Sequence, residues 1–259
     1  MIGMKFTYKM ISDPTINDSK YKCVKKFEGN EHNKVCVVTN FEKNYVVKKV
    51  KSREELTLEY TMGKVLDHSS ILSVFDVDFS NNVMCMEYFE SQDLFDIISN
   101  GVMVNKLGIW EQLLVVIEYL HENGIAHCDI KLENVLVNKN NELRLIDFGS
   151  ARNADSLTNT LFGTLGCWSP EQYDGFFVVP KKVDMWCLGL MFYTLFTDKC
   201  LWDQPEDKQW NQYIYDGLDS LLIDDDLSDN VKSILHGTLS GEKKRMSIQE
   251  LRAIKLGDF

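Results

Sequence analysis

The stretch His-Cys-Asp-Ile-Lys-Leu-Glu-Asn at residues 127–134 decides the fold. Within it, Asp129 is an acid that can take the proton of a hydroxyl group, and Lys131 brings a positive charge two residues later. Thirteen residues after Asn134, Asp147 opens an Asp-Phe-Gly triplet. The side chains of Asn134 and Asp147 carry oxygen atoms, which small hard cations prefer. These residue types in two separate loops predict a site for phosphoryl transfer.

The two motifs, in this order and at this spacing, resemble those of the eukaryotic-type protein kinases. The resemblance extends from about Tyr21 to Leu251. It implies an α+β, bilobal fold in which residues 1–259 form a single protein kinase domain around a cleft. A small lobe with an antiparallel sheet and one helix is expected over about 1–88, and a larger, mainly helical lobe over 89–259.

The resemblance also assigns roles in the large lobe. Asp129 would orient the acceptor hydroxyl and accept its proton, and Lys131 would neutralise charge on the moving phosphoryl group. Asn134 and Asp147 would hold Mg²⁺, with Mn²⁺ as an alternative, and Leu136 would form the floor under the adenine of ATP. A lysine at position 131 is typical of serine/threonine kinases.

The small lobe begins with strand-like alternation. Residues 21–24 and 35–38 predict a hairpin, and residues 45–50 predict a third strand. The resemblance places a glycine-rich, phosphate-covering loop at residues 27–34, and Val35 after it against the nucleotide. The three usual glycine positions of that loop hold Glu28, Asn30 and Asn33. This departure predicts poorer contact with the phosphates of ATP.

Lys48 matches the strand lysine that contacts the α- and β-phosphates in the family. Lys49 is the alternative, but strand alternation points it to the opposite face, and Val46 on the face of Lys48 would then roof the adenine. Glu59 is the expected helix partner of Lys48. Glu55 is the fallback, one helical turn earlier.

Residues 52–66 predict that partner helix. Its expected apolar stripe consists of Leu58, Met62, Val65 and Leu66. Gly63 stands one turn after Glu59, where active kinases place a large side chain against the phenylalanine of the Asp-Phe-Gly motif. Two interpretations stay open at this point: either a neighbouring Met or Tyr fills the gap, or the helix needs support from outside.

Residues 83–89 predict a buried strand that leads into the connection between the lobes. By resemblance, Met86 is the gatekeeper, and the backbone of Glu87 and Phe89 binds the adenine edge. Asp93 falls where the family often has a carboxylate for the ribose hydroxyls. It also stands at a predicted helix start, where a capping aspartate is the ordinary explanation, and both readings stay open.

Several further positions match the family. Thr164 would hydrogen-bond near Asp129 and Lys131. Asp184 would brace the catalytic loop, and Glu171 would pair with Arg245. Cys128 replaces the arginine that anchors a phosphorylated activation loop. The hydroxyl residues of that loop are Ser156, Thr158 and Thr160. Their phosphorylation is therefore not expected to switch the enzyme on.

The net charge of −11 argues against direct binding of nucleic acid and favours basic partners, although a solvated acidic surface also explains it. The seven cysteines are scattered, without a CxxC pair, and indicate reduced thiols of an intracellular protein. No stretch is long and apolar enough to predict a membrane span.

Among kinases, the motif strings look most like those of the small late serine/threonine kinases of baculoviruses. That resemblance implies a place in the cytoplasm and nucleus of an infected host cell, in late gene expression, with a basic, protamine-like DNA-packaging protein as substrate. Glu133 matches a family contact to a basic substrate residue, whereas Thr194 replaces a second acid. The alternative is a pseudokinase scaffold. A homodimer through the Glu59 helix is also expected, because a second copy could order that helix.

Overall fold

The structure is a computed structural model that describes residues 22–27, 34–39, 42–202, 206–222 and 227–256. The chain divides into two units after Ser91, and the later segment Arg144–Gly149 belongs to the first unit. The sequence placed the division near residue 88 and assigned everything after it to the second part. Segment 144–149 joins the first unit because Leu145 N donates to Ser70 O (2.7 Å) and Leu72 N donates to Leu145 O (3.3 Å).

The first unit contains an antiparallel sheet and a helix. Its elements are β1 (Lys22–Phe27), β2 (Lys34–Thr39), β3 (Asn44–Lys49), α2 (Arg53–Val65), β4 (Val74–Asp78) and β5 (Val83–Glu87). The described strands pair in the order β1-β2-β3-β5-β4. The predicted hairpin and third strand are present, and residues 28–33, which include the glycine-poor loop positions Glu28, Asn30 and Asn33, lie outside the described residues.

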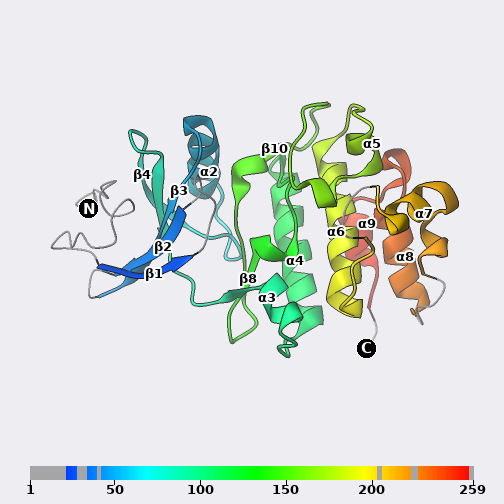
Figure 1. Cartoon of the computed structure of the whole chain (residues 1–259), viewed down its shortest axis with the longest axis horizontal. Coiled ribbons are helices and arrows are strands. Elements are labelled where there is room, and N and C mark those ends of the chain that lie inside the picture. Colours follow the sequence, from blue (N-terminus) through cyan, green and yellow to red (C-terminus); the bar gives the residue numbers. More distant parts are fainter. Residues whose placement is uncertain (1–21, 28–33, 40–41, 203–205, 223–226, 257–259) are drawn as a thin grey trace. The chain divides into compact units, whose positions relative to one another are not determined.

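Strand alternation separates the two faces of this sheet. One face buries a cluster that consists of Cys36, Val38, Tyr45, Val47, Val83 and Cys85. On the other face, Leu56 of α2 packs with Val50, Val74 and Met84. Figure 1 shows α2 beside β4, in agreement with their contact. Lys48 follows Val47 and therefore points away from the first cluster.

The predicted apolar stripe of α2 is right at Leu66, which is buried at the C-terminal cap of the helix, but wrong at Val65. The buried residues of the helix are Leu56 and Glu59, whereas Val65 is exposed. A Cβ atom at Gly63 would lie 2.2 Å from Val74 Cγ2, so the inward face consists of Leu56, Glu59 and Gly63 at helical spacing. The gap at Gly63 is filled, but by Val74 instead of a Met or Tyr, and β4 approaches α2 closely there.

The second unit is mainly helical. Its elements are β6 (Gln92–Asp93), α3 (Leu94–Ser99), α4 (Lys106–Glu122), β7 (Ile125–Ala126), β8 (Val135–Val137), β10 (Arg152–Asn153), α5 (Pro170–Tyr173), α6 (Pro180–Thr197), α7 (Lys208–Asp216), α8 (Asp229–Thr238) and α9 (Ile248–Ala253). Strand β9 (Leu143–Leu145) spans the division. Within this unit, α6 packs against both α4 and α8 (Figure 1). The predicted α+β class is confirmed.

Candidate active site

Lys48 and Glu59 form a buried ion pair in the first unit, with Nζ and Oε1 2.5 Å apart. Lys48 lies on β3, and Glu59 lies in the second turn of α2, whose start is capped by Ser52 Oγ accepting a hydrogen bond from Glu55 N. The predicted pair is therefore present. It contains Lys48 instead of the alternative Lys49, and Glu59 instead of the fallback Glu55.

Asp147 is the second carboxylate near the same ammonium group. Its Oδ1 lies 3.3 Å from Lys48 Nζ. The backbone of Asp147 has a left-handed φ of 66°, which turns the chain between β9 and Phe148. The side chain of Asp147 is 39% exposed, whereas that of Glu59 is 5% exposed. Asp147 can therefore reach a bound ligand, while Glu59 can only hold Lys48.

Burial makes the carboxyl group of Glu59 hard to ionise even though it pairs with Lys48. Burial raises the pKa of the Glu59 carboxyl to about 7; Lys48 works against this rise and Asp147 adds to it. We attribute the main effect to burial, because the more exposed Asp147 keeps its charge in contact with water. Glu59 is therefore easier to protonate in the ligand-free protein than an ordinary glutamate.

This raised pKa predicts a stability difference between the native chain and Glu59→Gln. Between the ordinary value of 4.5 and about 7, the folded state holds a proton that the unfolded chain has released. The resulting stability is full below pH 4.5 and is lost as pH rises through 7. The native free energy of unfolding should therefore fall relative to Glu59→Gln by on the order of 3 kcal/mol over this range.

Urea unfolding of the metal-free proteins at several pH values measures this difference. Glu54→Gln is the matched control, because Glu54 lies exposed on the same helix. A native curve that runs parallel to the Glu59→Gln curve from pH 5 to 8 would contradict the assignment.

Four residues predicted to contact the nucleotide share one face of the sheet. Val35 on β2 pairs with Lys48 on β3, and Val46 on β3 pairs with Met86 on β5. Because Val46 and Lys48 are two residues apart on one strand, their side chains point to the same side. This face can cover a flat, apolar ring and offer one positive charge beside it.

The segment after β5 carries the two predicted backbone contacts. Glu87 N donates to Ser73 O (2.9 Å), and Phe89 O accepts a hydrogen bond from Ser91 Oγ (2.9 Å). The guanidinium of Arg144 lies 4.6 Å from the centre of the Phe89 ring. These contacts order the segment, and the roles of Glu87 and Phe89 in binding adenine stay predictions.

Asp129 in the second unit lies at the centre of a hydrogen-bond network. Its Oδ1 accepts bonds from Thr164 N and Thr164 Oγ1, both at 2.8 Å. Lys131 Nζ donates to the same Thr164 Oγ1 (2.7 Å) and lies 3.5 Å from Asp129 Oδ2. The predicted link from Thr164 to Asp129 and Lys131 is therefore present, and it fixes the Asp129 carboxylate three residues before the 3-10 turn Leu132–Asn134.

Asn134 is buried and oriented by the same loop. Its Nδ2 donates to Asp129 O (2.8 Å) and to Asp129 Oδ2 (3.0 Å). Because the amide nitrogen is used in this way, Asn134 Oδ1 is the atom left to serve as a ligand. An oxygen donor of this kind suits Mg²⁺.

Asp184 of α6 braces the catalytic loop, as predicted. Its carboxylate accepts hydrogen bonds from His127 N (2.9 Å) and Cys128 N (2.7 Å). His121 Nε2 lies 2.8 Å from the same carboxylate, a contact that the sequence analysis missed. These bonds support Cys128 in its left-handed conformation, with φ of 66°. Gly163 approaches so closely that an added Cβ would lie 2.5 Å from Cys128 O.

Asp93 and Leu136 lie opposite each other where β6 pairs with β8. Asp93 Oδ1 accepts a hydrogen bond from Asp96 N (2.8 Å) and caps α3. The capping reading of Asp93 is therefore confirmed. Its contact with ribose, like the place of Leu136 under adenine, stays a prediction.

The activation-loop end is held by the predicted pair of Glu171 and Arg245, with Oε1 and Nη1 2.7 Å apart.

Comparison with known proteins gives the same family. The sequence pattern described as "Protein kinase domain" matches residues 17–256. The chain belongs to the protein kinase family.

Curated serine/threonine kinases are similar to this kinase domain over much of its length. A "Probable serine/threonine-protein kinase KIN1 homolog" of Encephalitozoon cuniculi is 33% identical over 65% of this chain and 30% of its own. The serine/threonine-protein kinase PrkC of Bacillus subtilis is 30% identical over 61% of this chain and 28% of its own. NUAK family SNF1-like kinase 1 of Homo sapiens is 28% identical over 74% of this chain and 30% of its own. The chain thus spans about a quarter to a third of the length of such relatives.

Cys128, at the position where the resemblance predicted an arginine, is buried. Burial raises the pKa of the Cys128 thiol. The nearby cation Arg152, which the sequence analysis missed, offsets only part of this rise. Arg152 Nη1 donates to Ser150 O (3.0 Å) and Ala151 O (2.9 Å), so this nitrogen is already engaged.

All seven cysteines are free thiols. In the described part of the chain, no helix has the length and apolar character needed to cross a membrane.

Proposed function

We propose that the chain is an active serine/threonine protein kinase that transfers the γ-phosphoryl group of ATP to protein hydroxyl groups. The network around Asp129 carries this proposal. Its carboxylate is fixed by Thr164 and Asn134, and Lys131 stands next to it. The acceptor hydroxyl requires a fixed acid that can take its proton, and the transferred phosphoryl group requires a cation beside that acid.

In this mechanism, Asp129 Oδ2 orients the acceptor hydroxyl and takes its proton as the new P–O bond forms, while the bond between the γ-phosphorus and the bridging oxygen breaks and ADP leaves. Lys131 offsets the negative charge of the transferred group. Lys48, held by Glu59, binds the α- and β-phosphates of ATP. Thr164 holds Asp129 in place through both of its hydrogen bonds.

The oxygen donors of Asn134 and Asp147 fit Mg²⁺, and Mn²⁺ has the same preference for oxygen. Mg²⁺ usually takes only one or two protein ligands, together with water and the phosphates of its substrate, so a carboxylate and an amide suffice. When bound, the ion neutralises charge on the β- and γ-phosphates of ATP.

A pseudokinase scaffold is the second candidate, and one sequence feature favours it. The three usual glycine positions before Val35 hold Glu28, Asn30 and Asn33. The buried pair of Lys48 and Glu59 supports the enzyme, because a scaffold gains nothing from an ammonium group aligned for phosphate.

Basic proteins are the proposed substrate class. Residues 92–259 contain 15 Lys and Arg against 26 Asp and Glu, and residues 1–91 contain 13 of each, so the charge of −11 belongs to the part with Asp129. Glu133, the position expected to contact a basic substrate residue, is exposed. Fields of one sign attract substrates of the opposite sign.

We expect a basic peptide to be phosphorylated at least about tenfold more efficiently than a matched acidic peptide at low salt, and Glu133→Gln to reduce that preference. Steady-state kcat/KM for both peptides, at low and high salt, measures it. Asp96→Asn, at an exposed position of α3, is the control. Equal rates on the two peptides would refute the substrate class.

The resemblance to the late baculovirus kinases motivates a finer proposal. On that basis we propose that the enzyme acts in the cytoplasm and nucleus of an infected host cell, in late gene expression, on a protamine-like DNA-packaging protein. A protein of that kind is strongly basic, in agreement with the charge of this chain.

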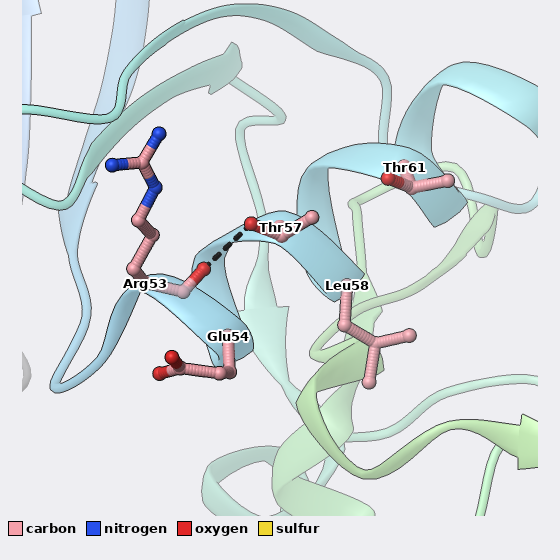
Figure 2. Close-up of a pocket in the computed structure, with 5 residues that line it drawn as sticks. All are labelled: Arg53, Glu54, Thr57, Leu58 and Thr61. Carbon is pink, nitrogen blue, oxygen red and sulfur yellow. Dashed lines mark hydrogen bonds between the residues drawn. The ribbon is translucent and has the colours of Figure 1, made fainter.

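Control of activity is proposed to lie at α2, through a homodimer. The outer side of α2 has an open hollow lined by Arg53, Glu54, Thr57, Leu58 and Thr61. Figure 2 shows these side chains along the helix, where Thr57 Oγ1 donates to Arg53 O (2.7 Å). A second copy bound there would hold the helix and thereby Glu59 against Lys48.

We therefore expect specific activity to rise with protein concentration, by roughly 5- to 150-fold for a coupling of about 1–3 kcal/mol. Alanine at Ser156, Thr158 and Thr160 should leave it unchanged, because Arg152 is engaged and the loop is already hydrogen-bonded. Activity against concentration, alongside sedimentation, measures both. A strictly monomeric protein that is fully active when dilute would refute the dimer.

A further inference from the structure

Besides Leu165, which is 52% exposed, four large apolar side chains are exposed around the activation segment of the second unit. Each is between 56% and 63% exposed: Leu157, Leu161, Phe176 and Phe177. Single exposed apolar residues are ordinary, but clustered ones indicate a binding surface. We call these four residues the apolar platform.

Backbone pairing brings the two segments of the platform together. Thr158 and Val178 form an antiparallel bridge with bonds in both directions, Thr158 N to Val178 O (3.0 Å) and Val178 N to Thr158 O (2.8 Å). Leu157 and Phe177 each precede a bridge residue. Val178 is buried, so strand alternation points its neighbours outward.

Further hydrogen bonds and an ion pair hold the backbone of the platform in place. Lys181 N donates to Ala154 O (3.1 Å), and Lys181 Nζ forms an ion pair with Asp155. The neighbouring Phe162 is buried, and its carbonyl accepts a hydrogen bond from Trp168 Nε1 (2.9 Å). The exposed side chains therefore sit on an ordered backbone, which lowers the entropy lost when a partner binds.

We propose that the apolar platform docks an apolar segment of the protein substrate, a few residues away from the phosphorylated hydroxyl. This inference rests on the proposed function and adds a second contact to it. The substrate would then combine basic residues near the acceptor with Leu, Ile or Phe farther along the chain.

Continuity with the catalytic loop favours the substrate as occupant. Leu161 stands three residues before Thr164, whose backbone and hydroxyl both bind Asp129. A polypeptide whose serine reaches Asp129 therefore lies within a few residues of the platform, because each extended residue spans about 3.3 Å.

Charge disfavours a second copy of the chain as occupant. A two-fold contact through the platform would bring the exposed Asp174 of both copies to the same interface. The unit that carries the platform also holds the negative charge of the protein. A basic substrate avoids this repulsion.

The test compares peptides and variants. The core peptide is arginine-rich with one serine, and it is extended on either side by a tail containing two leucines or by a Gly-Ser tail of equal length. One leucine tail should lower KM about tenfold relative to its Gly-Ser counterpart, the effect of burying part of one or two large side chains. Leu157→Ser/Phe177→Ser should remove this advantage and leave kcat on the core peptide unchanged.

Met103→Ser is the matched control, because Met103 is an exposed apolar residue of the same unit on another loop. Circular dichroism verifies the fold, and Phe176→Ser is the second variant. The proposal is overturned if neither leucine tail lowers KM, or if its advantage persists in the double variant. It is also overturned if the native chain sediments as a dimer and the double variant as a monomer.

Failure of the proposed function can be distinguished from failure of the docking proposal. In that case the native chain transfers no phosphate even to the core peptide. Fluorescence binding of labelled peptides then still tests the platform: tighter binding of a leucine-tailed peptide that is lost in the double variant supports it, and equal binding of all peptides refutes it.

Discussion

Asp129→Asn is expected to lower kcat for phosphoryl transfer by about 10²–10⁴-fold, the usual contribution of a general base. Asparagine has almost the same shape as aspartate, so Thr164 can still donate to its Oδ1. Its amide group cannot accept the hydroxyl proton. The KM for ATP should change little, because Asp129 acts on the acceptor and the phosphates are assigned to Lys48.

Transfer of labelled phosphate from Mg-ATP to a basic peptide measures this loss, and thermal unfolding verifies the fold. Asp198→Asn is the matched control, because Asp198 is an exposed aspartate of the same unit that pairs with Lys106. A pure Asp129→Asn protein with near-native activity would remove Asp129 from the mechanism.

Lys48→Met is expected to reduce activity and stability together, and the two losses should separate in the double variant. The single change leaves the buried Glu59 without its cation. The loss of one partner of a buried ion pair typically lowers the free energy of unfolding by about 3–5 kcal/mol, and we expect a loss of that order here. Adding Glu59→Gln removes the uncompensated charge and should restore most of the free energy of unfolding. Activity should stay roughly 10²–10³-fold low in both variants, because the charge on the phosphates is missing.

Urea unfolding and kcat/KM for ATP on the native, single and double variants measure this separation. Lys49→Met is the control on the neighbouring strand position, and it should affect activity little. If Lys48→Met/Glu59→Gln regained native activity, Lys48 would have only a structural role.

Contacts between motif residues were predictable from the sequence. Lys48 with Glu59, Glu171 with Arg245, and Asp184 with the catalytic loop all form as expected. Each of these residues sits at a fixed distance from a recognisable string, so the resemblance supplies the long-range geometry. Local signals also sufficed for caps, because an aspartate such as Asp93 binds an amide only three residues away.

Contacts set by packing were not predictable. The buried face of α2 contains Glu59 and Gly63, so a search for apolar residues missed these two and wrongly included the exposed Val65. The fit of Val74 against Gly63 depends on how closely β4 approaches the helix. His121 meets Asp184 only because α4 crosses α6. The platform also escaped notice, because exposure of Leu157 and Phe177 follows from one bridge.

The central claim is that this chain catalyses phosphoryl transfer to serine or threonine, and one measurement tests it most directly. The native chain and Asp129→Asn are incubated with γ-labelled Mg-ATP and a basic protein, and the labelled amino acids are identified. The account predicts phosphoserine or phosphothreonine with the native chain and only background with Asp129→Asn. A native chain that binds the basic protein but labels it no more than Asp129→Asn does would contradict the claim and identify a scaffold.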